Sequence, residues 1–218
     1  MARHFDLLVF DWDGTVVDSA GHIVDSIQAA ATDVGLAAPS DERARHIIGL
    51  GLSDAMTYLF PDLSPADYPR LTERYRFHYL AGDHKVKLFD GAHDGIRDFR
   101  AAGFSLAVAT GKSRMGLDRA LKDSGLQSFF HASRCADEGF PKPHPDMLLY
   151  LMDELVVDAQ RTLMIGDTTH DLEMARSAGV PAVAAGYGAH PRANLEAQGP
   201  LACVSSFREL VQWVQQNG

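Results

Sequence analysis

The sequence predicts an α/β protein in which helices alternate with the strands of a mostly parallel sheet, and a helical segment is inserted after the first strand. Three observations favour this fold class. Short apolar runs alternate with stretches of helical spacing, and several of those stretches end in a glycine just before a new apolar run. The chain between the first and second apolar runs is also too long for one crossover helix.

The predicted strands are short, continuous apolar runs bounded by residues that favour turns. Such runs are typical of parallel strands covered on both faces, because neither side of the strand then meets water. The four runs are Leu7–Phe10, Phe104–Ala109, Thr162–Ile165 and Pro181–Ala185.

The predicted helices of the main domain carry apolar residues three or four positions apart, as in Ile96 and Phe99 or Leu117 and Leu121. Glycine just past the end of a helix is a common stop signal, because it adopts the left-handed conformation freely. Such glycines precede the next apolar run at Gly103, Gly125 and Gly179. Strands alternating with stopped helices predict repeated right-handed crossovers.

The segment from Asp18 to about Lys87 reads as mostly helical. Ile23 and Ile27 open a helix that Gly35 stops, and prolines at 61, 65 and 69 break the segment in the middle. Further helices are expected over Ala55–Phe60 and Leu71–Leu80. We therefore divide the chain into a helical insertion at 17–87 and a main domain at 1–16 and 88–218.

Composition narrows the function classes. The 218 residues are 46% hydrophobic and 22% charged, as in an ordinary globular chain, and the net charge is −9. This acidic balance argues against nucleic-acid or anionic-membrane binding. Two cysteines, Cys135 and Cys203, form neither a disulfide framework nor a zinc pattern, which favours a reducing compartment. Without a leader-like apolar segment or a membrane-length apolar window, a cytoplasmic location is expected.

The first group of candidate functional residues follows the first strand. Asp11 and Asp13 are two positions apart, so an extended backbone would direct both carboxylates to one side, and Gly14 permits a tight turn. Paired carboxylates suit Mg²⁺, or a nucleophile beside a general acid. The alternative is an ordinary strand-to-turn boundary.

Two further groups lie at later strand ends. Thr110 and Gly111 end the second run, where a hydroxyl and free N–H groups can hold an anion, although a plain turn is the alternative. Lys142 stands between Pro141 and Pro143, which fix the backbone on both sides of it. A cation held in place can neutralise phosphate charge, whereas an exposed lysine in a proline-rich loop would have no such role.

The fourth group is Asp167 and Asp171, after the third run. If a helix opens near Thr169, Asp171 lies in its first turn, where the helix dipole favours an anion. Either carboxylate could hold a metal or could merely cap the helix. Since parallel strands present their carboxyl ends at one edge of the sheet, all four groups are expected to converge there.

In this order the four groups resemble the motifs of the haloacid dehalogenase-like hydrolase superfamily. The matching segments are Asp11–Thr15, Thr110–Lys112, Lys142 between prolines, and Gly166–Asp171. The resemblance implies a Rossmann-like core and a small helical cap at 17–87. Within the superfamily, Asp11–Ser19 and Ile48–Leu52 look most like the phosphoglycolate phosphatase group.

The resemblance also implies a mechanism. Asp11 would attack the phosphorus of a phosphate monoester and form an aspartyl-phosphate, and Asp13 would act as general acid and then base. Mg²⁺ would bind Asp11, the Asp13 backbone carbonyl and Asp167, with Asp171 orienting a metal water or Lys142. Thr110 and the Gly111 N–H would bind phosphate oxygens.

The same resemblance implies how the substrate is chosen. An acid at Asp13 argues for a phosphatase or phosphomutase over a dehalogenase. The cap would close over the site through a loop containing Gly49 and Gly51. Arg45 and His46 precede this loop and could contact a substrate carboxylate, or could lie on a solvated helix face. A small acidic ester such as 2-phosphoglycolate is the leading substrate; sugar phosphates and nucleotides stay open.

Three other functions are alternatives to hydrolysis. A phosphosugar mutase would reuse the same core and return the phosphoryl group to a second hydroxyl. A non-catalytic binding module would have no need to keep Asp11 and Asp13 together. A receiver domain of the response-regulator type would lack a helical insertion after the first strand. No pattern in the sequence indicates an oligomeric state.

Overall fold

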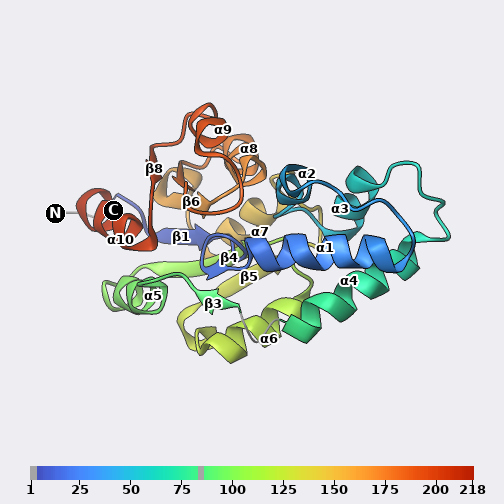
Figure 1. The fold of residues 1–218 in the computed structure, drawn as a ribbon. Helices are drawn as coiled ribbons and strands as arrows, with labels where there is room; N and C mark the ends of the chain where they lie inside the picture. The colour runs from blue at the N-terminus through green and yellow to red at the C-terminus, as the bar shows by residue number, and fades with distance from the viewer. Residues whose placement is uncertain (1–3, 83–85) are drawn as a thin grey trace.

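The computed structural model describes residues 4–82 and 86–218, and its centre is a six-stranded parallel sheet (Figure 1). This confirms the predicted fold class. In spatial order the strands are β5 (Ala132–Cys135), β4 (Ser105–Thr110), β1 (Leu7–Phe10), β6 (Thr162–Gly166), β7 (Ala182–Ala185) and β8 (Ala202–Val204). The first strand lies between β4 and β6. The chain builds the sheet on one side of β1 with β4 and β5, and then on the other side with β6, β7 and β8.

The two edge strands were not among the four predicted ones. β5 reads Ala-Ser-Arg-Cys and β8 reads Ala-Cys-Val, and only the last residue of each is buried. Edge strands contact the sheet on one side only and are not covered evenly, so they need no continuous apolar run. By contrast every residue of β1 and β6 is buried, which is why periodicity identifies them.

Helices cover both faces of the sheet. Side chains of Leu8 and Phe10 pack with α5 (Ala92–Ala101), α6 (Arg114–Ser124) and α10 (Phe207–Asn217). Leu7 and Val9 point to the opposite face and pack with α7 (Asp146–Leu155) and α8 (Thr169–Ser177). A short helix, α9 (Arg192–Glu196), lies beside β8. Single 3₁₀ turns occur at Gln127–Phe129 and Ala159–Arg161. The predicted glycine stops at 103, 125 and 179 all have positive φ.

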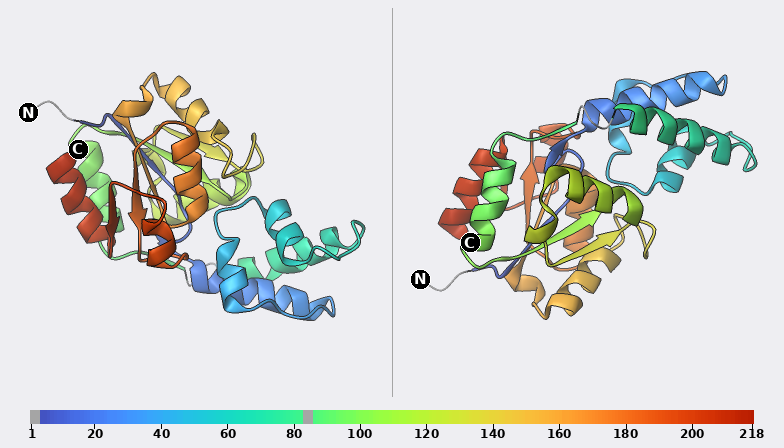
Figure 2. Two further views of the ribbon diagram at one scale, coloured as in Figure 1. Left: turned by 90° about the horizontal axis from the view of Figure 1, so that it is seen from above. Right: turned by 90° about the horizontal axis from the view of Figure 1, so that it is seen from below.

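The segment after β1 forms a separate helical unit, the cap. Its helices are α1 (Ala20–Asp33), α2 (Asp41–His46), α3 (Leu52–Leu59) and α4 (Tyr68–Gly82), and they stand to one side of the core (Figure 2). Ile27, Met56 and Leu71 belong to the apolar cluster of the cap, which Ala189 of the core also joins. The chain enters and leaves the cap through a two-stranded antiparallel pair, β2 (Val17–Asp18) and β3 (Lys87–Leu88).

The proline cluster acts differently from expectation at one position. Residues 61 and 65 lie between α3 and α4, but Pro69 is the second residue of α4. In the first turn of a helix a backbone N–H has no intrahelical partner, so proline costs nothing there. The helix predicted over Leu71–Leu80 consequently starts earlier, at Tyr68.

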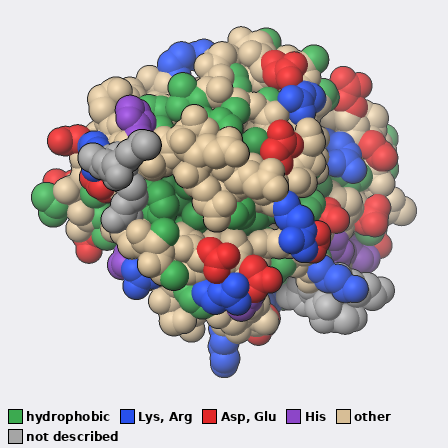
Figure 3. Space-filling view, turned by 90° about the vertical axis from the view of Figure 1, so that its left-hand side faces the viewer, with side chains coloured by type: hydrophobic (Ala, Val, Ile, Leu, Met, Phe, Trp, Pro, Cys, Tyr) green, Lys and Arg blue, Asp and Glu red, His purple; other side chains and the backbone are tan. Residues whose placement is uncertain are grey.

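The surface shows no concentration of one charge on the face that carries α5 and α10. Acidic and basic side chains lie close together there, with apolar side chains between them (Figure 3). Arg97 pairs with Asp94, and Arg208 pairs with Asp90. Within the described part of the chain, no helix combines the length and the apolar character needed to cross a membrane.

Candidate active site

The carboxyl ends of four strands meet at the edge of the sheet that faces the cap. Asp11 follows β1, Thr110 ends β4, Lys142 lies in the loop after β5, and Asp167 follows β6. All four side chains are buried, with Lys142 only 2% exposed. The structure thus brings together the residues that the sequence placed at successive strand ends.

Lys142 links two carboxylates at the centre of the site. Its Nζ lies 2.8 Å from Asp11 Oδ1 and 2.6 Å from Asp171 Oδ1. Burial raises the pKa of Asp11 well above its usual range, and the positive charge of Lys142 acts against that rise. The two carboxylates in turn keep the pKa of Lys142 above its ordinary value despite burial. The lysine therefore stays charged and favours the ionised form of Asp11.

Asp171 is fixed by the start of α8. Thr168 is the N-cap residue, and its hydroxyl accepts from the backbone N–H of Asp171. The Asp171 Oδ2 in return accepts from the Thr168 backbone N–H at 3.1 Å and from its hydroxyl at 2.7 Å. This reciprocal capping box leaves Oδ1 for Lys142. One oxygen of Asp171 thus caps the helix, and the other contacts Lys142.

Asp167 is held by two donors from opposite sides. The Thr15 hydroxyl donates to its Oδ1 at 2.8 Å, and the Ala189 backbone N–H donates to its Oδ2 at 2.7 Å. A Cβ on either Gly14 or Gly188 would collide with this carboxyl group, so both glycines make room for it. Burial, with the nearby Asp171 charge, raises the pKa of Asp167 to about 7.

The carboxylates of Asp11, Asp167 and Asp171 form a cluster suited to a hard cation. One oxygen from each lies within 4.8 Å of the others. Asp11 Oδ2 is buried and has no hydrogen-bond partner among the described residues. Three carboxylates face the single ammonium of Lys142, and oxygen donors are the ligands that Mg²⁺ prefers. These residues therefore fit the expected metal. The carboxylate of Asp13 lies outside this cluster.

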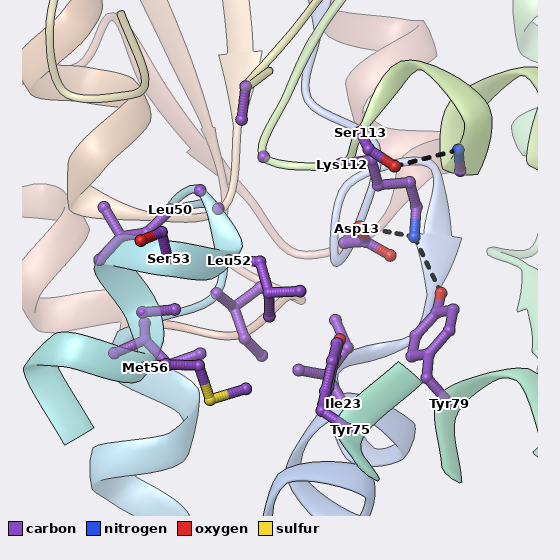
Figure 4. A pocket seen from close by; sticks show the side chains of 18 of the residues that line it. Asp13, Ile23, Leu50, Leu52, Ser53, Met56, Tyr75, Tyr79, Lys112 and Ser113 are labelled. Atoms are coloured by element: carbon purple, nitrogen blue, oxygen red, sulfur yellow. Dashed lines mark hydrogen bonds and ion pairs between the residues drawn. The ribbon is translucent and has the colours of Figure 1, made fainter. Parts of the chain in front are cut away.

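Asp13 faces the cap instead. Its Oδ1 accepts from the Ser19 hydroxyl at 2.7 Å, and its Oδ2 lies 3.0 Å from Lys112 Nζ. Lys112 also donates to the Tyr79 hydroxyl of α4 at 2.8 Å (Figure 4). The two aspartates of the first motif therefore have separate partners, and the side chain of Lys112 joins Asp13 to the cap.

The loop between α2 and α3, residues 47–51, is called the cap loop here, and it lies directly on the strand end that carries Thr110. The Thr110 hydroxyl accepts from the Lys112 backbone N–H at 3.2 Å. A Cβ on Gly111 would come within 2.6 Å of the Gly49 carbonyl oxygen and 2.5 Å of that of Leu50. Gly49, with φ of 92°, would place a Cβ 3.9 Å from Asp11 Oδ2 and 3.2 Å from the Thr168 hydroxyl. Glycine at both positions allows the cap backbone to cover the site closely.

A cavity of about 590 Å³ extends from Asp13 between the cap and the core. Side chains of α1, α3 and α4 line one side, and residues around Lys112 line the other (Figure 4). Its inner wall is apolar. The cavity is open to solvent, so a ligand can enter it. It reaches the side chain of Asp13, which is predicted to act as the general acid.

Not every predicted residue lies at the cavity. Arg45, at the end of α2, is absent from its lining. The neighbouring His46 stacks on His190 and contacts His170, and its backbone carbonyl accepts from both rings. These imidazoles hold the cap against the core, and burial lowers the pKa of His190 to about 4.

Four residues that contact site groups were missed. Thr15 holds Asp167, while Ser19, Lys112 and Tyr79 hold Asp13 or its partner. Thr15, Ser19 and Lys112 belong to the matching segments, so the motifs contained a signal for them. Tyr79 comes from α4 of the cap, 33 positions before Lys112 in the chain, and no local pattern indicates that the two side chains meet.

Comparisons with known proteins agree with this geometry. The family model of the haloacid dehalogenase-like hydrolases matches residues 8–185. A probable phosphatase, IndB of Dickeya dadantii, is 35% identical over 94% of this chain and 91% of its own length. Phosphoglycolate phosphatase of Agrobacterium fabrum is 32% identical over 84% of this chain and 81% of its own. The crystal structure of a predicted phosphoglycolate phosphatase from Haemophilus somnus superposes with a TM-score of 0.86 at 24% identity, covering 99% of this chain and all of that one.

Proposed function

The chain belongs to the haloacid dehalogenase-like hydrolases, and we propose that it is a Mg²⁺-dependent phosphatase that hydrolyses a phosphate monoester through an aspartyl-phosphate. The observation that carries this proposal is the pairing of two differently held aspartates. Asp11 is buried beside Lys142 with one oxygen unpartnered, and Asp13 lines the cavity. A nucleophile and a separate acid–base group are the two groups that such a reaction needs.

In the first step an oxygen of Asp11 forms a bond to phosphorus while the bond from phosphorus to the leaving oxygen breaks. Asp13 gives its proton to that oxygen, so the product leaves as an alcohol. The Thr110 hydroxyl and the Gly111 N–H bind phosphate oxygens at the end of β4, with Lys142 neutralising charge beside the nucleophile.

In the second step Asp13, now a carboxylate, takes a proton from water as the water oxygen bonds to phosphorus. The bond between phosphorus and Asp11 breaks, and phosphate is released. The Ser19 hydroxyl, 2.7 Å from Oδ1, and Lys112 Nζ, 3.0 Å from Oδ2, hold the Asp13 carboxyl group in position for both proton transfers.

Mg²⁺ would be held by Asp11, Asp167 and the backbone carbonyl of Asp13. Asp171 would act indirectly, by orienting Lys142. When bound, the ion offsets the repulsion between the carboxylates and an incoming phosphate dianion. A side chain at Gly49 would reach towards Asp11 Oδ2, so glycine keeps side-chain atoms away from that oxygen.

The finer form of the proposal concerns the substrate. Relatives named phosphoglycolate phosphatase make 2-phosphoglycolate the reference compound, as the sequence motifs also suggest. In this reading Arg45 would contact its carboxylate, which requires the cap to move, since Arg45 does not line the cavity in the present arrangement.

The test is phosphate release from a panel of phosphate monoesters with Mg²⁺ or with EDTA. We expect release that requires Mg²⁺ and falls at least about a thousandfold in Asp11→Asn, because the nucleophile is lost. Asp153→Asn, the same change on the exposed face of α7, is the matched control and should retain full activity. Acid quenching during turnover should trap one phosphoryl group on the wild-type protein, at Asp11.

Other outcomes would favour the alternative functions. Interconversion of phosphosugars without phosphate release would indicate a mutase. A folded protein that binds Mg²⁺ but neither releases nor transfers phosphate would indicate a binding module and would contradict the proposal.

A further inference from the structure

We propose that the preferred substrate carries an uncharged, apolar leaving group, such as an alkyl or ring-bearing alcohol, in place of a small acid. This inference rests on the proposed phosphatase activity and specifies which ester the same site takes. It is drawn from the position of the cavity, the chemistry of its wall and its size.

The position of the cavity indicates which part of the substrate enters it. Its lining includes Asp13, Gly111 and Lys112 but neither Asp11 nor Lys142, so it starts on the side of the acid–base residue. Asp13 protonates the oxygen between phosphorus and the leaving group in the proposed mechanism. A group attached to that oxygen would therefore extend into the cavity, and the phosphate would stay with the strand ends.

The wall of the cavity is apolar where it is most enclosed. Ile23 comes from α1, Leu52 and Met56 from α3, and Leu50 from the cap loop (Figure 4). Met56 is 1% exposed and Ile23 is 7% exposed. Tyr75 of α4 adds a ring whose hydroxyl pKa is raised by burial. An apolar group placed against these side chains gains contacts and loses water, whereas a carboxylate placed against Ile23, Leu52 or Met56 would lose its hydration without a partner from them.

The charged residues of the lining lie mostly at the mouth. Asp54, Arg76, Arg119 and Asp137 are exposed to solvent. Lys112 lies deeper, but its ammonium already pairs with Asp13 and donates to Tyr79. A substrate carboxylate would have to compete with Asp13 for this lysine. The mouth also exposes two large apolar side chains, Met115 at 82% and Leu80 at 46%, which could contact a longer group.

The size of the cavity argues in the same direction. Its volume of about 590 Å³ lies within the range of roughly 300–1,000 Å³ typical of sites for drug-sized ligands. Glycolate contributes only a few heavy atoms and would leave most of this apolar space filled with water. A chain of several carbons or a ring system would fill it.

The experiment is a series of primary alkyl phosphates from ethyl to octyl, assayed with Mg²⁺ beside 2-phosphoglycolate. The leaving alcohols of the alkyl series have nearly the same acidity, so differences report binding of the chain and not chemical reactivity. We expect kcat/KM to rise about threefold to fourfold per methylene until the cavity is full, since each buried methylene contributes a nearly constant increment. The longer esters should exceed 2-phosphoglycolate.

Two substitutions on α3 sharpen the test. Leu52→Gln places an amide in the cavity wall and should flatten the dependence of kcat/KM on chain length. Thr57→Gln puts the same side chain at an exposed position of the same helix, away from the lining, and should leave the slope unchanged. Thermal unfolding of both variants shows whether the cap stays folded.

The possible failures are distinguishable. If 2-phosphoglycolate is hydrolysed and the alkyl series is flat, or slower at every length, the apolar leaving group is wrong and the phosphatase proposal stands. If no ester releases phosphate in the presence of Mg²⁺, the proposed function fails and this inference fails with it.

Discussion

The two ends of the candidate site are built in opposite ways. At the proposed phosphate end, Asp11, Lys142, Asp167 and Asp171 are almost completely buried, and their partners come from the start of α8 and the loops that follow the core strands. At the leaving-group end, side chains from three cap helices surround an open cavity and make few hydrogen bonds.

The difference reflects two kinds of interaction. Buried charges need partners at defined distances and angles, so loss of one partner leaves an uncompensated charge. Apolar contacts are non-directional, and a wall made of them accepts changes of shape with small losses. We therefore expect substitutions at the phosphate end to abolish activity, and those at the cavity to change which ester is used.

The largest effect should follow removal of the central cation. Lys142→Met leaves three clustered carboxylates without their buried ammonium, so we expect destabilisation by about 3–5 kcal/mol and a loss of activity of at least about a thousandfold. Denaturant unfolding with and without Mg²⁺ measures the first, and the stability loss should shrink when Mg²⁺ is added.

Lys122→Met, on the exposed face of α6, is the control for charge removal in general and should change stability by less than about 0.5 kcal/mol. A Lys142→Met protein of normal activity would show that the phosphate end tolerates loss of a partner as the cavity does, and the contrast between the two ends would be lost.

The second prediction concerns pH and the metal. Because the pKa of Asp167 in the folded protein is raised to about 7, the metal-free folded state binds a proton more tightly than the unfolded chain does. That carboxyl therefore makes the metal-free protein less stable as pH rises from about 4 to 7. Mg²⁺ binds the ionised form, so the increase in Tm on adding Mg²⁺ should grow between pH 5 and pH 8.

The increase in Tm on adding Mg²⁺ is more informative than Tm itself, because the titration of His190 changes stability with pH in the opposite direction to that of Asp167. The pKa of His190 is lowered to about 4, so this residue makes the folded state more stable as pH rises towards the unfolded value. Asp167→Asn should remove most of the increment at every pH. An increment that is equal at pH 5 and pH 8 in the wild type would contradict the assigned role of Asp167.

The smallest effect is expected where the two ends meet. Tyr79→Phe removes the hydroxyl that accepts from Lys112 and keeps the ring that packs beneath the lysine. The loss of one hydrogen bond of about 1 kcal/mol predicts a roughly fivefold rise in KM with kcat little changed, because the cap is held less firmly over Asp13. Steady-state kinetics with an alkyl phosphate measures both constants.

Tyr58→Phe is the matched change at a half-exposed cap position outside the cavity lining and should leave both constants unchanged. If Tyr79→Phe lowers kcat as strongly as a change at the phosphate end, then Lys112 and Tyr79 belong to the catalytic arrangement and the division between the two ends must be redrawn.

The sequence predicts the two ends of the site unequally. Leu7–Phe10 was predicted with its observed bounds, because a central strand is apolar on both faces and a motif follows it directly. The carboxyl ends of parallel strands converge by topology, so the sequence alone predicts that Asp11, Thr110, Lys142 and Asp167 meet.

The cavity could not be predicted in this way. Ile23, Met56 and Tyr75 are far apart in the chain and lie on different helices, and the angles between those helices decide which faces meet. Arg45 shows the same difficulty, since the packing of α2 decides whether a residue just before the cap loop lines the cavity, and here Arg45 does not.

The paired strands β2 and β3 have a consequence for how such a protein can change. Because Val17 lies opposite Leu88, the points where the cap leaves and rejoins the core are neighbours in space. A chain that lacked the cap would need only a short turn to join them, and a cap of different length could be inserted there without moving any core strand. Under the proposed function, the core would keep one set of phosphate-handling residues while the chamber for the alcohol is exchanged as a module.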